Sequence, residues 1–189
     1  MLDVYHLPYN VFCPVICMDE KPYQLLGERR EPIPMKSGYK KKVDNEYERM
    51  GTCSIFVMTE PLTGWVYTHA RKQRTAEDWA YEIRDLLTVH FPKSPKIKLV
   101  LDNLNTHVIA SSYKVFPPKE ARELAKRLEI HYTPKHGSWL NMAEITISVV
   151  SRQCLCRRIY SIDFLNSELL AWSSDLNQNR SPVKWQFTT

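Results

Sequence analysis

The chain lacks most of the features that mark secreted, membrane-bound or low-complexity proteins. It has only 5 glycines against 12 prolines in 189 residues, a balance that favours stiff connecting loops over flexible repeats. Near the N-terminus there is no basic start followed by an apolar core. Its apolar runs are far shorter than the ~20 residues that a membrane-spanning helix needs. The sequence therefore predicts a cytoplasmic protein with no membrane partner.

Cysteine is also scarce, and its spacing excludes a disulfide framework. The 5 cysteines are an odd number at irregular intervals, positions 13, 17, 53, 154 and 156. Neither close pair has the two-residue spacing that is usual for structural zinc. We interpret them as reduced and mostly buried thiols. A chain of this length can bury enough apolar surface to fold without a disulfide or a metal.

The excess of positive charge is modest. The chain has 26 Lys and Arg residues against 21 Asp and Glu residues, which gives a formal net charge of +5. This balance is compatible with a nucleic-acid partner and equally with a mildly basic protein that binds none. With 43% hydrophobic and 25% charged residues, the composition is that of a globular domain.

Short β-type runs alternate with helical runs along the chain. β-branched and aromatic residues predict strands over 14–18, 52–59, 65–69, 97–101 and 129–133. Apolar spacing and capping signals predict helices over 75–90, 117–128, 141–157 and 163–177. Residues 145–149 also alternate as a strand does, but an N-cap signature and the apolar rhythm favour a helix there. The order predicts an α/β fold with a central mixed sheet flanked by helices.

Two acidic residues directly follow short apolar strands. Asp19 comes after Val-Ile-Cys-Met and Asp102 after Leu-Val-Leu, so each is expected where a buried strand ends. Ligand-binding groups of open α/β sheets gather beyond strand ends. Two neighbouring carboxylates repel unless a cation lies between them, and Mg²⁺ suits such a position. Glu144, on the first turn of the next expected helix, would supply a third acid.

Each of these acids also has a purely structural explanation. Asp after a strand is an ordinary turn-forming residue. Asn141 and Glu144 have the spacing of a capping box, in which Glu144 would serve only the helix N-terminus. Position in the sequence alone leaves both explanations open.

Three stretches of the chain resemble the catalytic domain of DDE transposases. They are VICMDEK around Asp19, LVLDNLNTH around Asp102 and YTPKHGSWLNMAEI before and around Glu144. The resemblance is in particular to the bacterial insertion-sequence branch of the mariner-type superfamily. It covers nearly the whole chain, including GWVYTHARKQRTAEDWA and the terminal WQFTT. Each motif is weak alone, but together and in this order they are a strong signal.

The resemblance implies a single RNase H-like catalytic domain over residues 1–189. Carried over, Asp19, Asp102 and Glu144 are the catalytic acids, which hold two Mg²⁺ or Mn²⁺ ions per active site. Polar residues near these acids are expected to support them or to contact the substrate: Asn103, His107 and Asn141. The implied reaction is phosphoryl transfer, in which water nicks the transposon end and the freed 3′-hydroxyl joins target DNA.

The implied partners are transposon-end DNA, target DNA and a second subunit in a homodimer, at the nucleoid of a bacterial cytoplasm. Basic residues are candidates for contacts with the DNA backbone. Those in the Pro-rich stretch from Pro22 to about Arg49 are Arg29, Arg30, Lys40, Lys41 and Lys42, although a solvated basic loop explains them equally well. Lys135 and His136 are better placed to meet a phosphate. We interpret Trp139 as a core residue rather than a base-stacking one.

Members of this family carry a helix-turn-helix region ahead of the catalytic domain, and the residues before Asp19 are too few for one. This departure leaves two classes of function. The first is a metal-dependent DNA nicking and strand-transfer enzyme. The second is a truncated, catalytically idle remnant that only binds DNA or another subunit. A generic nuclease of RNA–DNA hybrids would account for the fold but not for the motifs.

Overall fold

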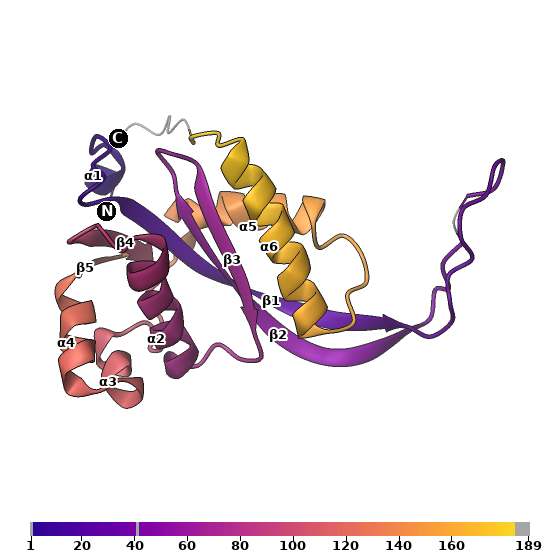
Figure 1. Ribbon diagram of the computed structural model, residues 1–189, viewed down its shortest axis with the longest axis horizontal. Helices are drawn as coiled ribbons and strands as arrows, with labels where there is room; N and C mark the ends of the chain where they lie inside the picture. The colour runs from indigo at the N-terminus through magenta and orange to yellow at the C-terminus, as the bar shows by residue number, and fades with distance from the viewer. Residues whose placement is uncertain (1, 41, 184–189) are drawn as a thin grey trace.

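The computed structural model describes residues 2–40 and 42–183. Lys41 and the terminal WQFTT, both singled out in the sequence, lie outside this range. Five strands form one mixed sheet in the order β3-β2-β1-β4-β5 (Figure 1). Their bounds are β1 (Val15–Glu28), β2 (Tyr47–Glu60), β3 (Trp65–Arg71), β4 (Ile97–Leu101) and β5 (Leu128–Tyr132). β1, β2 and β3 are antiparallel neighbours, whereas β4 and β5 run parallel to β1. The expected mixed sheet is confirmed.

Helices cover both faces of this sheet. They are α1 (Leu2–Tyr5), α2 (Ala76–Asp85), α3 (Ser112–Val115), α4 (Pro118–Lys126), α5 (Ala143–Gln153) and α6 (Ile162–Gln178). A π-helical turn, Leu86–His90, continues α2 to the end that its apolar spacing predicted. The segment 145–149 is helical, as favoured over a strand. No helix in the described part of the chain is long and apolar enough to span a membrane.

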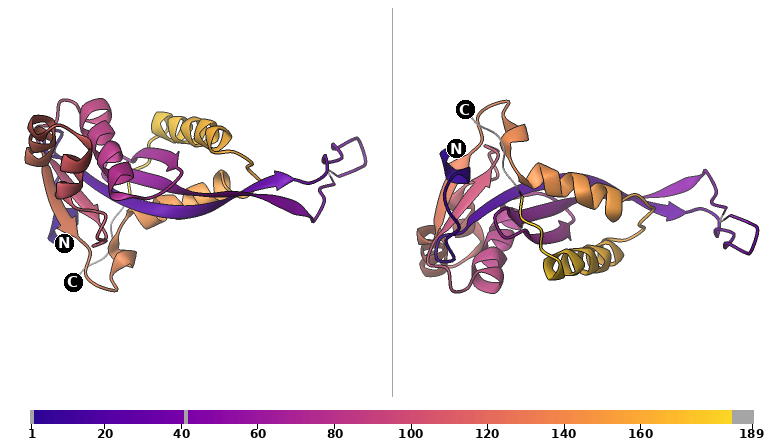
Figure 2. Two further views of the ribbon diagram at one scale, coloured as in Figure 1. Left: turned by 90° about the horizontal axis from the view of Figure 1, so that it is seen from below. Right: turned by 90° about the horizontal axis from the view of Figure 1, so that it is seen from above.

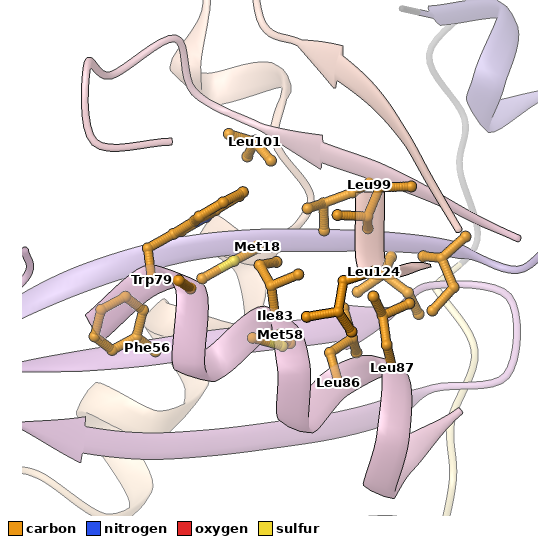
Figure 3. Packing of buried hydrophobic residues seen from close by; sticks show 14 of the residues in the cluster. Met18, Phe56, Met58, Trp79, Ile83, Leu86, Leu87, Leu99, Leu101 and Leu124 are labelled. Atoms are coloured by element: carbon orange, nitrogen blue, oxygen red, sulfur yellow. The ribbon is translucent and has the colours of Figure 1, made fainter. Parts of the chain in front are cut away.

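Side chains that alternate along the strands form one hydrophobic layer on each face of the sheet. Ile16 and Met18 of β1 pack with Trp79 and Ile83 of α2 (Figure 3). Val15 and Cys17, on the opposite face, pack with the start of α5, and α6 lies on the same side over β2 and β3. Because successive side chains of a strand point to opposite faces, the next two residues of β1 also divide between these layers. Asp19 belongs to the α5 face and Glu20 to the α2 face.

The first strand is much longer than the sequence suggested. The expected strand ended at Asp19, but β1 continues to Glu28 because β2 pairs with it over this whole length. Pairing with β4 stops at Cys17, so the rest of β1 has a neighbour on one side only. Such an edge tolerates Pro22, which cannot donate a ladder hydrogen bond. Residues that were expected to form a loop are therefore strand.

Between β1 and β2 the chain forms a projecting hairpin, which we call the arm (residues 29–46). It extends beyond the helices and lies at the opposite end of the molecule from β4 and β5 (Figures 1 and 2). Two isolated bridges, Ile33↔Lys42 and Lys36↔Tyr39, hold its two sides together. At its base, Arg158 pairs with Glu28 and donates to the main-chain oxygen of Asp44 at 2.7 Å.

The cysteines form no disulfide, as the sequence predicted. Cys17, Cys53 and Cys154 are buried, Cys13 is half-buried and Cys156 is exposed.

Candidate active site

Asp19, in β1, and Asp102, directly after β4, lie side by side where the pairing of these two strands ends. The parallel ladder of β1 and β4 pairs Ile16 with Leu99 and ends where Cys17 pairs with Val100. Each acid comes two residues after that last pair. Asp102 follows the end of β4, as expected, whereas Asp19 stands inside β1. The expectation that Asp19 ends its strand is wrong, but the pairing with β4 does end before it. That leaves room beside Asp19 at the edge of the sheet.

Glu144 approaches the same two acids from α5. Burial, together with the negative charges of Glu144 and Asp102, raises the pKa of Asp19 to about 7. A hydrogen bond of 2.8 Å from the Glu20 main-chain N–H to Asp19 Oδ1 acts in the opposite direction. The three acids are therefore close enough to influence one another. Glu144 is exposed on the first turn of its helix.

Asn141 ties the start of α5 to the strand that carries Asp19. Its Nδ2 donates to the main-chain oxygen of Met18 at 2.8 Å, and its Oδ1 accepts from the Ala143 N–H at 3.2 Å. Met142 is the N-cap residue of α5 and makes no side-chain capping bond. The capping box between Asn141 and Glu144 is not formed.

A buried imidazole lies behind the two aspartates. His107 Nε2 is 2.6 Å from Glu20 Oε1, and its Nδ1 is 2.7 Å from Asp102 Oδ1. The Nδ1–H donates to the main-chain oxygen of Asp102 at 3.2 Å. Burial disfavours the charged ring, but the bonds to Asp102 and Glu20 outweigh it and raise the pKa of His107 to about 10. The ring is therefore a cation at neutral pH, which offsets part of the negative charge here.

The acids fit a hard divalent cation. Asp102 Oδ1 is buried 2.7 Å from the charged ring of His107, and this one positive charge offsets only part of the negative charge of Asp19, Asp102 and Glu144. Close carboxylate oxygens are also the ligands that Mg²⁺ and Mn²⁺ prefer. His107 itself is a poor ligand for such an ion. Its two ring nitrogens already face Glu20 and Asp102, and one ion cannot be bound from both sides of the ring.

An open cavity of about 410 Å³ adjoins Asp102. It is lined by several residues that the sequence had singled out, namely Asn103, Lys135 and His136, and by Leu104, Thr133, Pro134 and Ser138. His136 adopts a left-handed backbone conformation (φ 64°), which is uncommon for a residue other than glycine. Lys135 and His136 are both exposed. The structure thus brings this loop to the acids.

Trp139 lies on the same loop but is not a core residue. Its side chain is 64% exposed, so the prediction that it fills the core is wrong. The short 3₁₀ turn Ser138–Leu140 directs Leu140 inward instead. Trp79, in contrast, is fully buried and stacks on His107 with ring centres 6.0 Å apart.

The basic residues of the arm are not brought to the acids. About 30 Å of extended strand separates Arg29 from Asp19 at the usual rise per residue. Arg29 pairs with Glu46 at 2.8 Å and Arg30 with Asp44 at 3.5 Å, across the base of the arm. Lys40 and Lys42 are exposed farther out on the arm. Any DNA that they contact is distant from the acids of the same subunit.

Sequence reasoning missed Glu20. Its side chain is only 3% exposed, although it directly follows Asp19 in the motif. The signal that could have found it is strand alternation, because a glutamate on the α2 face of a buried strand needs a polar partner.

Residues 14–166 match the family model of the DDE superfamily endonucleases. The chain belongs to this family. Two solved structures resemble this chain over 92% of its length, the Mos1 mariner paired end complex with Mn and the Mos1 strand transfer complex. The TM-scores are 0.59 and 0.58 at 15% and 13% identity. At such low identity the likeness concerns the fold, which is RNase H-like as predicted.

The chain spans about half the length of those chains, 52% and 50% respectively. Among curated proteins, none matches it.

Proposed function

We propose that this chain is a metal-dependent DNA endonuclease and strand transferase, the catalytic part of a transposase of the bacterial insertion-sequence type. One observation carries the proposal. Asp19 in β1 and Asp102 directly after β4 lie side by side where the pairing of these strands ends, and the negative charges of Glu144 and Asp102 act on Asp19. Such a set is suited to divalent cations, and two Mg²⁺ or Mn²⁺ ions are proposed per site.

In this proposal Asp19, Asp102 and Glu144 hold the metal. Metal held by these acids would supply activation of the attacking oxygen and stabilisation of the leaving oxygen in an in-line displacement at phosphorus. Asn141 keeps α5, and hence Glu144, against the strand of Asp19. Lys135 and His136 border the cavity next to Asp102, where a DNA phosphate would enter. Asn103 lines the same cavity and would contact the substrate.

The similar structures support DNA as the partner. One is a paired end complex and the other a strand transfer complex, which name the holding of transposon ends and their joining to a target. By analogy, water would attack first to nick the transposon end, and the freed 3′-hydroxyl would then attack target DNA. Neither step needs a covalent protein intermediate. Because this chain spans half of those chains, the proposal covers the chemical steps and not the recognition of the ends.

A homodimer is the proposed active unit. When two transposon ends are held together, DNA is nicked at two places. Because each chain has one active site, two chains are needed. The arm offers a surface for such contact, since its side chains Ile33, Met35 and Tyr39 are 59%, 76% and 71% exposed.

Nicking of supercoiled plasmid tests the proposed chemistry. With Mg²⁺ or Mn²⁺ the purified protein should convert supercoiled to open-circular DNA. Asp102→Asn should reduce the rate by at least roughly 100-fold, because several kcal/mol of transition-state stabilisation depend on the metal. Asp175→Asn, an equal charge change on the exposed face of α6, should leave the rate unchanged. If the wild type binds DNA but cuts none with either metal, the idle-remnant alternative is the better description.

A further inference from the structure

The metal-binding acids proposed above are supported from the other face of the sheet. Asp19 belongs to the α5 face and Glu20, the next residue, to the α2 face. The Glu20 carboxylate is 3% exposed and lies 2.6 Å from His107 Nε2. A buried carboxylate of this kind is stable only with a strong partner, which His107 provides. Glu20 is thus shielded from the side on which Glu144 approaches.

His107 carries this contact to Asp102. Its side chain is 1% exposed and spans from Glu20 on one side to Asp102 on the other. The ring is held in place by its stacking on Trp79, with an angle of 28° between the ring planes. Its main-chain oxygen accepts a hydrogen bond of 2.8 Å from Tyr132 Oη of β5. The imidazole is therefore fixed by its contacts with Glu20, Asp102 and Trp79.

We propose that Glu20 is a positioning residue for the metal site. Its carboxylate fixes His107, His107 fixes Asp102, and the Glu20 main-chain N–H fixes Asp19 at 2.8 Å. One residue thereby orients both strand-borne acids before a metal binds. This inference rests on the proposed function. Groups that orient metal ligands in this way typically change metal affinity by about 10- to 100-fold when they are removed.

Two other roles for Glu20 are less consistent with the geometry. As a direct metal ligand it would share an ion with Asp102, and ligand atoms of Glu20, Asp102 and His107 do lie within 4.8 Å of one another; however, His107 uses one ring nitrogen to contact each carboxylate, so its ring occupies the space between them. As a purely structural residue it would stabilise the fold without affecting the metal. Measuring both metal affinity and stability on the same variants distinguishes a purely structural role from a positioning role.

The test measures Mn²⁺ binding without DNA, from the electron paramagnetic resonance signal of free Mn²⁺, at a temperature where every variant is folded. Glu20→Ala should weaken binding by about tenfold. Glu20→Gln should stay within about threefold of the wild type, because its side-chain oxygen accepts the same hydrogen bond. Should Glu20→Ala not fold, Glu20→Asp replaces it, since its shorter side chain no longer reaches His107.

A matched control is available in the same layer. Glu82 is fully buried and also contacts a histidine, with its Oε1 2.7 Å from His69 Nδ1 and 2.6 Å from Arg71 Nε. Glu82→Ala should lower the melting temperature and leave Mn²⁺ affinity unchanged. If Glu82→Ala and Glu20→Ala weaken binding equally, or if Glu20→Ala leaves it unchanged, the positioning role is overturned.

The path through His107 is tested by a double-mutant cycle. If Glu20 acts on Asp102 through His107, Glu20→Ala/His107→Ala should bind Mn²⁺ no more weakly than His107→Ala alone. Additive losses would contradict that path. Failure of the proposed function would give a different result. Either the wild type would bind no Mn²⁺, or the Asp102→Asn variant would bind Mn²⁺ as tightly as the wild type.

Discussion

Asp19, a proposed metal ligand, lowers the stability of the metal-free fold. Its carboxyl group is largely buried next to Glu144 and Asp102, so its pKa is raised to about 7. Above that pH the folded protein holds a carboxylate that burial and neighbouring charges both disfavour. The unfolded chain holds the same carboxylate in water without this cost. Ionised Asp19 therefore lowers the free energy of unfolding unless a cation is bound.

From this we predict that Asp19→Asn stabilises the metal-free protein. At pH 8 with EDTA its free energy of unfolding should rise by about 1–3 kcal/mol, below the upper limit set by the size of the pKa shift. The gain should disappear as the pH falls to about 4, where the carboxyl group is protonated in the folded state, and it should shrink when Mg²⁺ is added. Thermal unfolding measures all three conditions, with Asp175→Asn as control. A lower melting temperature at pH 8 would instead assign Asp19 a structural role.

At the scale of single elements, α2 is formed by local signals. Thr75 Oγ1 accepts a hydrogen bond of 3.1 Å from the Asp78 N–H, and Asp78 Oδ2 accepts one of 2.9 Å from the Thr75 N–H. This reciprocal pair satisfies two main-chain donors at the helix N-terminus. The helix in turn carries Trp79, which stacks on His107. Capping and the support of the site are thus linked through one helix.

Removing the cap should lower the stability of the protein without affecting the nicking of DNA. Thr75→Ala is expected to lower the free energy of unfolding by about 1 kcal/mol, the usual cost of losing such a cap. Because most of α2 is held by its buried apolar face, the helix should persist and nicking should be unaffected. Urea unfolding followed by circular dichroism, with Ser174→Ala in α6 as control, gives the comparison. A loss of nicking in the folded variant would show that the start of α2 does more than cap.

The elements that were predictable from the sequence are those with such local signals. The turn between β2 and β3 and the capped helix α2 formed where expected, and α5 formed from its apolar rhythm without the expected cap, whereas β2 begins at Tyr47, five residues before the strand expected from position 52. The length of β1 was not predictable, because residues such as Pro22 join the strand only through pairing with distant β2. The meeting of Asp19 with Asp102 followed from acids placed after apolar runs. Glu20 was missed because its partner His107 is distant in sequence and lies on the other face of the sheet.

On the scale of the whole molecule, two regions are far apart. The acids lie where β1 meets β4, and the arm projects from the opposite end (Figure 1). At about 30 Å along the strand, the arm cannot complete the active site of its own chain. Its exposed apolar side chains contribute nothing to the core, yet such side chains usually mark a surface that another protein covers. We therefore propose the arm as the surface through which the two copies of a homodimer would make contact.

Substituting the arm should affect assembly alone. Met35→Ser/Tyr39→Ser removes the two most exposed apolar side chains of the arm, 76% and 71% exposed, and is expected to weaken self-association by at least about tenfold. Melting temperature and Mn²⁺ affinity should not change, since neither side chain belongs to the core or to the acids. Lys36→Ser/Lys40→Ser is the matched control, because it alters the same arm but removes charge rather than apolar surface. Sedimentation velocity with and without transposon-end DNA measures the association. A wild type that stays monomeric in both conditions would refute the homodimer, whereas a dimer that survives the Met35/Tyr39 change would place its interface away from the arm.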